Sequence, residues 1–163
     1  MPTAIGQELV ALLPRLRRFA LALCRSQSLA DDLVQGACER ALAHADGWTP
    51  GTRFDAWMFR ILRNHWIDHL RRTKAEGMAE DVTTHTQLIG DPGEGPIISK
   101  LLLSEVQRAI DSLPQDQREV LALVCGEDLT YREASEILNV PIGTVMSRLA
   151  RARRRLVELT KAA

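Results

Sequence analysis

The chain has 163 residues, which is enough for one medium-sized domain or two small ones. Hydrophobic residues make up 45% and charged residues 26% of the sequence, and 21 basic side chains balance 21 acidic ones. This composition is typical of a soluble globular protein and excludes a disordered chain.

Features of membrane and secreted proteins are missing from the sequence. The longest uncharged apolar run, Val120–Cys125, is far shorter than the roughly 20 residues that a membrane-spanning helix needs. The first residues lack a basic patch followed by an apolar stretch, so we expect neither a secretory signal nor membrane insertion. Cys24, Cys38 and Cys125 are widely spaced and form no CxxC motif, which predicts buried, reduced thiols in a cytoplasmic protein.

Charge is segregated along the chain and divides it into three parts. Residues 1–75 carry 11 basic and 7 acidic side chains, residues 76–98 carry 5 acidic and no basic ones, and residues 99–163 carry 10 basic and 9 acidic ones. The acidic stretch is also rich in Gly and Pro. We therefore predict a first domain at 1–73, a flexible acidic linker at 74–98 and a second domain at 99–163.

Three helices are predicted in the first domain. A single apolar stripe runs from Ile5 to Leu23 with helical spacing, and Pro14 is expected to start or kink this helix. Ser28–Asp31 is predicted to cap a second helix that ends near Ala43, and Thr52–Asp55 to cap a third that ends near Arg72. No strand-like alternation is present, so the predicted fold class is all-α.

The second domain is also predicted to be helical. One helix carries an apolar stripe that ends at Leu113, and another follows Pro114 and stops at Gly126. Thr130–Glu133 has the pattern of a capping box for a short helix to Leu138, and a last helix is expected from about Ile142 to Leu159.

The two C-terminal helices have the pattern of a helix-turn-helix, because a short helix, a tight turn and a longer basic helix follow one another. On a helical wheel, polar residues of the last helix face away from its apolar stripe: Thr144, Ser147, Arg148, Arg151, Arg154 and Arg155. The first four are placed to contact base edges in a major groove, and the last two to contact phosphates. A solvated arginine face on a packing helix is the alternative, but Arg148–Arg155 contains five arginines and no acidic residue.

The third helix of the first domain combines arginines with aromatic side chains. A polar arc on its wheel carries Arg60, Arg63, Asn64 and Arg71, is bordered by Trp57 and Asp68, and follows Trp48 and Arg53. A cationic strip edged by aromatic rings suits single-stranded DNA, since bases stack and phosphates pair with cations. We expect Phe54, Phe59 and Trp66 to belong to the core and Trp48 and Trp57 to be available for stacking.

No catalytic constellation or cofactor loop is present, so we expect neither an enzyme nor a bound cofactor. His65 and His69 are four residues apart and could share a metal, but both fall in the apolar arc without a third ligand nearby. We therefore predict no metal site. Asp31 and Asp32 lie in the first turn of the second helix, where carboxylates favour the helix dipole.

Three motifs, in this order, resemble those of one family. Leu29–Leu42 resembles a polymerase-binding helix, and Phe54–Arg72 resembles a −10 recognition segment with Asn64, Asp68 and Arg71 at its characteristic spacing. Leu113–Arg153 resembles a −35-binding domain. The chain is thus identified by resemblance as a member of the extracytoplasmic-function (ECF) group of sigma-70 RNA polymerase sigma factors.

The resemblance implies a transcription initiation factor without chemistry of its own. Its implied partners are core RNA polymerase, promoter DNA and an anti-sigma factor, and its implied role is in stress responses. Its implied fold is a region 2-like bundle of three or four helices and a region 4-like helix-turn-helix domain. Implied polymerase-binding residues are Asp31, Asp32, Gln35 and Glu39, and Arg132 joins the −35 set.

Three positions depart from the family pattern. Met146 and Ala150 stand where relatives often carry a basic and a larger residue, and Gly36 stands inside a helix where glutamate is usual. Met146 and Ala150 affect which −35 sequence the last helix reads, and Gly36 affects the local rigidity of the second helix. Two other classes compete with a sigma factor: a dimeric helix-turn-helix regulator, and a module that only sequesters another protein. A dimeric regulator has no reason to possess the motifs of the first domain, and the arginine cluster of the last helix counts against a module that does not touch DNA.

Overall fold

The structure is a computed structural model that describes residues 4–77 and 97–161. All regular elements in these ranges are helical, which confirms the all-α fold class. The first three helices are α1 (Ala4–Cys24), α2 (Gln27–Ala43) and α3 (Phe54–Ala75), with a 3₁₀ turn at Ala45–Gly47. The remaining helices are α4 (Ile97–Asp111), α5 (Gln115–Leu121), α6 (Tyr131–Leu138) and α7 (Ile142–Lys161), with a π turn at Ala122–Gly126. None of these helices is long and apolar enough to cross a bilayer.

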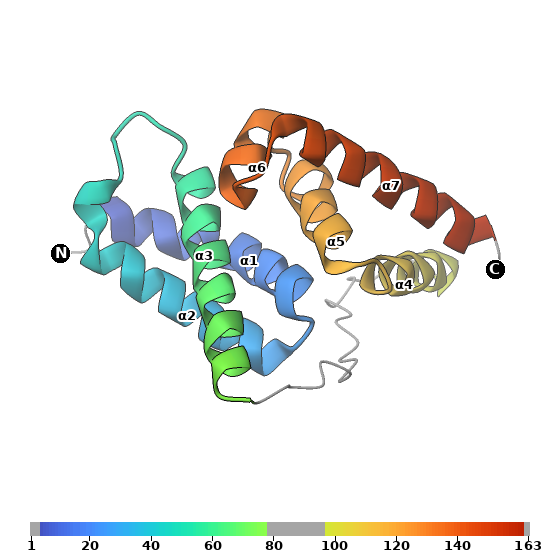
Figure 1. Cartoon of the computed structure of the whole chain (residues 1–163), viewed down its shortest axis with the longest axis horizontal. Coiled ribbons are helices and arrows are strands. Elements are labelled where there is room, and N and C mark those ends of the chain that lie inside the picture. The colour runs from blue at the N-terminus through green and yellow to red at the C-terminus, as the bar shows by residue number, and fades with distance from the viewer. Residues whose placement is uncertain (1–3, 78–96, 162–163) are drawn as a thin grey trace.

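The first domain is a bundle of α1, α2 and α3 (Figure 1). The apolar stripe of α1 is buried from Leu9 to Leu23, and Phe19 meets Phe59 of α3 edge to face with ring centroids 5.4 Å apart. Phe59 and Trp66 belong to the core as predicted, whereas Phe54 is half-buried. This packing sets which face of α3 remains exposed.

Pro14 lies within α1, so the expectation that it starts the helix is wrong, while the alternative expectation of a kink stays a prediction. Its ring is on the exposed side, while Leu12 and Leu16 on either side of it are buried in the same core. An interior proline costs a helix about 3 kcal/mol. Burial of the continuous stripe offsets that cost, so the helix continues through it.

Two predicted helix caps are wrong by one or two residues. Ser26, and not Ser28, caps α2 by accepting a hydrogen bond from the backbone N–H of Leu29. Arg53 precedes α3, and the hydroxyl of Thr52 instead donates to the carbonyl oxygen of Thr49 at 2.6 Å. The loop before α3 satisfies its own polar groups and leaves Arg53 free to reach another element.

The second domain contains α4 to α7, with α6 and α7 forming the helix-turn-helix. The capping box of α6 is confirmed: the Thr130 hydroxyl accepts from the Glu133 N–H and the Glu133 carboxylate accepts from the Thr130 N–H. Asn139 ends α6 in the left-handed conformation at φ 54°, a shape that Asn tolerates better than most residues. Residues 78–96, which include most of the predicted linker, lie outside the described residues.

The cysteines differ from one another in exposure. Cys24 is buried and Cys38 half-buried, and burial raises the pKa of both thiols. Cys125 is exposed at the end of the π turn, so its predicted burial is wrong. The apolar run Val120–Cys125 contains the buried residues Val120, Leu121 and Leu123, but its last residue lies at the surface of the domain.

Gly36 is explained by a close approach between α2 and α3. A Cβ atom at this position would lie 2.3 Å from Nε2 of His65, whose imidazole covers the glycine. The Nδ1 atom of His65 is buried without a hydrogen-bond partner in the described structure, and burial lowers the pKa of this histidine. The glycine is therefore the residue that admits the imidazole between the helices.

Gly36→Ala is expected to destabilise the protein, although alanine is the better helix former by about 1 kcal/mol. The added methyl group overpacks the His65 contact, and overpacking typically costs about 1–3 kcal/mol. Chemical denaturation of Gly36→Ala, His65→Ala and the double variant measures the interaction free energy between the two positions. Equal effects of Gly36→Ala with and without His65 would contradict this explanation.

Candidate nucleic-acid interface

The exposed face of α7 carries most of the predicted −35 residues. Ser147, Arg151, Arg154 and Arg155 are exposed, and the Ser147 hydroxyl donates to the Thr144 carbonyl. Arg132 of α6 is also exposed and contacts Glu136 one turn later at 3.9 Å. These side chains give the helix-turn-helix a cationic outer surface.

Thr144 and Arg148 lie at the edge of that surface. The Arg148 side chain is 24% exposed and its Nε lies 3.6 Å from the Asp116 carboxylate of α5. Thr144 is half-buried. The exposed face of α7 also contains Ile142, Met146 and Ala150, and 51% of Met146 is exposed. The face that meets solvent is thus rotated toward Met146 relative to the predicted one.

The apolar stripe of α7 ends earlier than predicted. Val145, Leu149 and Ala152 are buried, but Leu156 is half-buried and Leu159 is exposed. The last turns of α7 extend past the body of the second domain (Figure 1). The well-packed part of α7 is therefore its N-terminal half, which positions the side chains assigned to bases.

A row of side chains on one face of α3 forms the candidate single-strand surface. At 100° per residue, Trp57, Arg60, Asn64, Asp68 and Arg71 fall within about 80° of one another. Arg60, Asn64 and Arg71 are exposed, whereas Trp57 and Asp68 are half-buried. Arg40 of α2 pairs with Asp68 at 3.0 Å. The row combines two exposed cations, an amide and an aromatic edge.

Aromatic rings at the start of α3 form a platform beside this row. Trp48 meets Phe54 edge to face at 5.3 Å, and Phe54 meets Trp57 at 5.7 Å. Trp48 and Trp57 are each half-buried, and the indole N–H of Trp48 is buried without a partner in the described structure. Ring packing fixes the orientation of both tryptophans, and stacking of an unpaired base needs such rigid partners.

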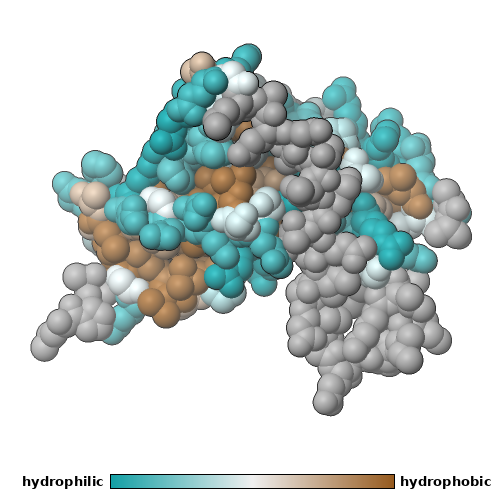
Figure 2. Space-filling model, turned by 90° about the horizontal axis from the view of Figure 1, so that it is seen from below, coloured by the Kyte–Doolittle hydropathy of each residue, from teal (hydrophilic) through white to brown (hydrophobic). Residues whose placement is uncertain are grey.

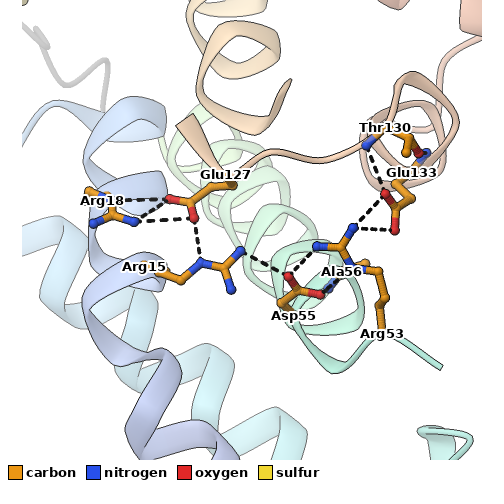
Figure 3. Close-up of polar contacts among 8 residues, drawn as sticks. All are labelled: Arg15, Arg18, Arg53, Asp55, Ala56, Glu127, Thr130 and Glu133. Carbon is orange, nitrogen blue, oxygen red and sulfur yellow. Dashed lines mark hydrogen bonds and ion pairs between the residues drawn. The ribbon is translucent and has the colours of Figure 1, made fainter. Parts of the chain in front are cut away.

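Arg53 and Arg63 lie apart from the row because both contact the second domain. Arg53 donates two hydrogen bonds to Asp55 and pairs with Glu133 of α6 at 2.8 Å (Figure 3). Arg63 pairs with Glu119 of α5 at 3.3 Å. Burial raises the pKa of Glu119, and the nearby Arg63 opposes that change. The structure therefore divides the predicted −10 residues into an exposed row and an interdomain pair.

Arg15, Arg18 and Glu127 complete this interdomain network and were not singled out from the sequence. Arg15 bridges Asp55 at 3.0 Å and Glu127 at 2.7 Å, and Arg18 also contacts Glu127 (Figure 3). Only 3% of the Glu127 side chain is exposed. Although burial works against it, hydrogen bonds from the arginines hold the pKa of Asp55 below its usual value. No sequence motif marks these residues, since Glu127 is more than 100 positions away from both arginines along the chain.

The ends of the helices are capped across the domain boundary. Arg118 of α5 donates to the carbonyl oxygens of Ala22 in α1 and of Leu113, and burial lowers its pKa to about 10. In the reverse direction, Arg25 donates to the carbonyl oxygen of Asp111 at 2.6 Å. Carbonyl groups at helix C-termini lack intrahelical partners. The two arginines therefore satisfy acceptors that the interface would otherwise bury.

The predicted polymerase-binding residues share the outer surface of α2. Asp31, Asp32, Gln35 and Glu39 are exposed, and Arg17 pairs with Asp31 at 3.1 Å. On the face seen from below, hydrophobic residues gather over the half of the molecule that holds the first domain (Figure 2). Apolar surface beside exposed polar groups is typical of a protein-binding surface.

The two histidines of α3 have structural contacts. His65 covers Gly36, and His69 stacks on Trp66 with ring centroids 5.8 Å apart. Within residues 4–77 and 97–161, no group of three His, Cys, Asp or Glu side chains is placed to hold a metal ion.

Comparison with known families decides the identity of the chain. The family model of Sigma-70 region 2 matches residues 9–76, and that of Sigma-70 region 4 matches residues 103–156. The chain belongs to the sigma-70 family. Its relatives place it in the ECF group, so it is a regulator of transcription initiation that directs RNA polymerase to promoters.

Several relatives of this sigma factor resemble it over most of their length. The ECF sigma factor EcfG of Rhodopseudomonas palustris is 38% identical over 156 residues, which cover 96% of this chain and 84% of that protein. SigW of Bacillus subtilis is 32% identical over 78% of this chain and 73% of its own. The solved structure of the sigma factor RpoE from Bartonella quintana, in complex with the anti-sigma factor NepR, has a TM-score of 0.80 at 35% identity, covering 95% of both chains.

Arg118→Met in this sigma factor is expected to lower the free energy of unfolding by about 1–3 kcal/mol, because two buried carbonyl groups lose a donor. Chemical denaturation of the whole chain measures the change. Arg108→Met is the matched control, since Arg108 is exposed on α4. Equal stability of the two variants would show that the interdomain cap contributes nothing.

Proposed function

We propose that this sigma factor binds core polymerase through α2 and reads its promoter at two places. The helix-turn-helix takes the −35 element as a duplex, and α3 takes the −10 element as an unpaired strand. One observation supports this division. The arginines of α7 form an exposed face, whereas the arginine row of α3 lies beside a rigid aromatic platform. The first suits a groove of paired DNA and the second suits exposed bases.

At the −35 element, Ser147 and Arg151 lie where the N-terminal half of a recognition helix meets base edges. Arginine can bind guanine through two parallel hydrogen bonds. Thr144 and Arg148 reach the same groove from the edge of the face, and Arg148 must first leave Asp116. Arg132, Arg154 and Arg155 contact phosphates, which fix the position of the helix without reading sequence.

At the −10 element, Asn64 reads an unpaired base, Trp48 and Trp57 stack on bases, and Arg60 and Arg71 hold the backbone. Taking a base out of the duplex costs a few kcal/mol. Because of this cost, we expect strand capture to require help from the polymerase. For this reason the free chain is expected to bind promoter DNA weakly.

An anti-sigma factor is the regulator that we propose for this chain. The support is the likeness to RpoE of Bartonella quintana, whose solved structure contains NepR. The likeness extends over both domains, so a partner that contacts both at once would find a similar surface here. We place the protein in the cytoplasm, where RNA polymerase works, and in a stress response.

In vitro transcription with purified core polymerase tests the proposed function. A library of genomic fragments should give promoter-dependent RNA only when this chain is added. A dimeric helix-turn-helix regulator would instead bind a palindromic site without polymerase, and a sequestering module would bind no DNA. Absence of initiation from every fragment would contradict the proposal.

Arg151→Ala and Asn64→Ala are expected to impair different steps. Loss of Arg151 should weaken −35 binding by about 1–3 kcal/mol, roughly 5- to 150-fold, because one base loses its bidentate partner. Loss of Asn64 should reduce opening of the −10 duplex, measured by permanganate reactivity of thymines, and leave closed-complex affinity nearly unchanged. Lys161→Ala is the control at an exposed site outside both faces. Identical defects in the two variants would contradict the division of labour.

A further inference from the structure

Four arginines of the first domain face three glutamates of the second. The arginines are Arg15 and Arg18 of α1, Arg53 at the start of α3, and Arg63 of α3; we call them the arginine face. Each forms an ion pair with a glutamate. Glu127 pairs with Arg15 and Arg18, Glu133 with Arg53, and Glu119 with Arg63. Two of these arginines, Arg53 and Arg63, also belong to the set predicted for single-stranded DNA.

The geometry of these contacts is that of an anion site. Arg63 donates through Nε and Nη2 to separate oxygens of Glu119, both at 3.3 Å, and Nη1 of Arg53 donates to both oxygens of Glu133 at 2.8 and 2.9 Å. The Glu127 carboxylate accepts from Arg15 at 2.7 Å and from Arg18 at 3.2 Å (Figure 3). Guanidinium groups bind phosphate oxygens through the same paired hydrogen bonds as carboxylate oxygens. A surface that holds three carboxylates in this way can hold phosphates in their place.

The glutamates and the arginine face come from parts of the chain that are far apart in sequence. Glu127 follows the π turn, Glu133 opens α6, and Glu119 belongs to α5, so all three leave the face together when the second domain moves away. Asp55 stays behind with Arg15 and Arg53, because it belongs to α3. Separation of the domains therefore exposes four arginines with a single acidic neighbour among the described contacts.

We propose that the arginine face binds the phosphates of promoter DNA, and that Glu119, Glu127 and Glu133 compete with that DNA in the free protein. The proposal rests on the function proposed above and adds Arg15 and Arg18 to the nucleic-acid interface. The domain contact and the DNA contact are mutually exclusive, since both use the same guanidinium groups. The closed chain is consequently the form with low affinity for DNA.

A purely structural role for the ion pairs predicts a different behaviour. If the pairs only join the two domains, their loss opens the chain without creating a new DNA-binding surface. If the arginine face binds phosphates, their loss opens the chain and increases its affinity for DNA. Affinity measured together with domain separation distinguishes the two roles.

The test compares two full-length variants with the same net charge. Glu127→Gln/Glu133→Gln removes two competing carboxylates, and the Gln at 133 can still accept the capping hydrogen bond from Thr130. Glu105→Gln/Glu136→Gln removes two exposed carboxylates of the same domain that lie outside the arginine face. Small-angle X-ray scattering reports the separation of the domains, and fluorescence anisotropy with a labelled 25-nucleotide single strand reports affinity.

The first variant should have the larger radius of gyration and should bind the strand about tenfold more tightly than the control, with a steeper dependence on salt. Adding Arg18→Gln to the first variant should reduce that gain measurably, because the opened face then has one phosphate-binding arginine fewer. Glu133→Gln alone, compared with Glu136→Gln, gives the same comparison with a smaller gain if the double variant is unstable.

Three results would overturn the proposal: an unchanged radius of gyration, an opened chain that binds no better than the control, or a gain that Arg18→Gln does not reduce. None of them affects the proposed function, because promoter-dependent initiation by the unmodified chain with core polymerase measures that separately. Initiation without the affinity gain would reject this inference alone.

Discussion

The arrangement of the two domains depends on the contact of Glu127 with Arg15 and Arg18. A carboxylate with only 3% of its side chain exposed needs hydrogen-bond partners in place of water, and the two arginines supply them. Both arginines come from α1, so this carboxylate fixes α1 against the π turn of the second domain. Arg53 and Arg63 can then reach Glu133 and Glu119. The same fixation aligns Arg118 with the open end of α1.

Polar contacts of this kind suit a protein that must change its shape. Buried residues of both domains form one hydrophobic cluster, yet charged pairs and helix caps surround the contact between the domains. Ion pairs lose little when DNA phosphates or a partner protein replace their carboxylates, whereas exposed apolar surface would have no such substitute in water. The charged pairs are therefore the part of the contact between the bundles that can be exchanged.

Local features of the sequence predicted most of the fold but little of the domain contact. Apolar spacing located the helices, and Thr130 and Glu133 marked the capping box, because these signals span only a few residues. The spacing could not show that Glu133 also binds Arg53, 80 positions earlier, or that Glu127 is buried. Gly36 was understood only once His65 was seen to cover it. Pro14 does not start the helix, because buried residues on both sides of it belong to one apolar stripe that a rule for isolated helices ignores.

The distance between the two domains, in the free chain and on the polymerase, tests most directly whether ion pairs hold the domains together and are released on binding. Fluorophores introduced at Lys74 and Lys161, both exposed and outside the proposed interfaces, report that distance by energy transfer. Energy transfer should be efficient in the free protein at low salt, lower at high salt, and lowest once core polymerase binds. Equal transfer in all three conditions would contradict this expectation.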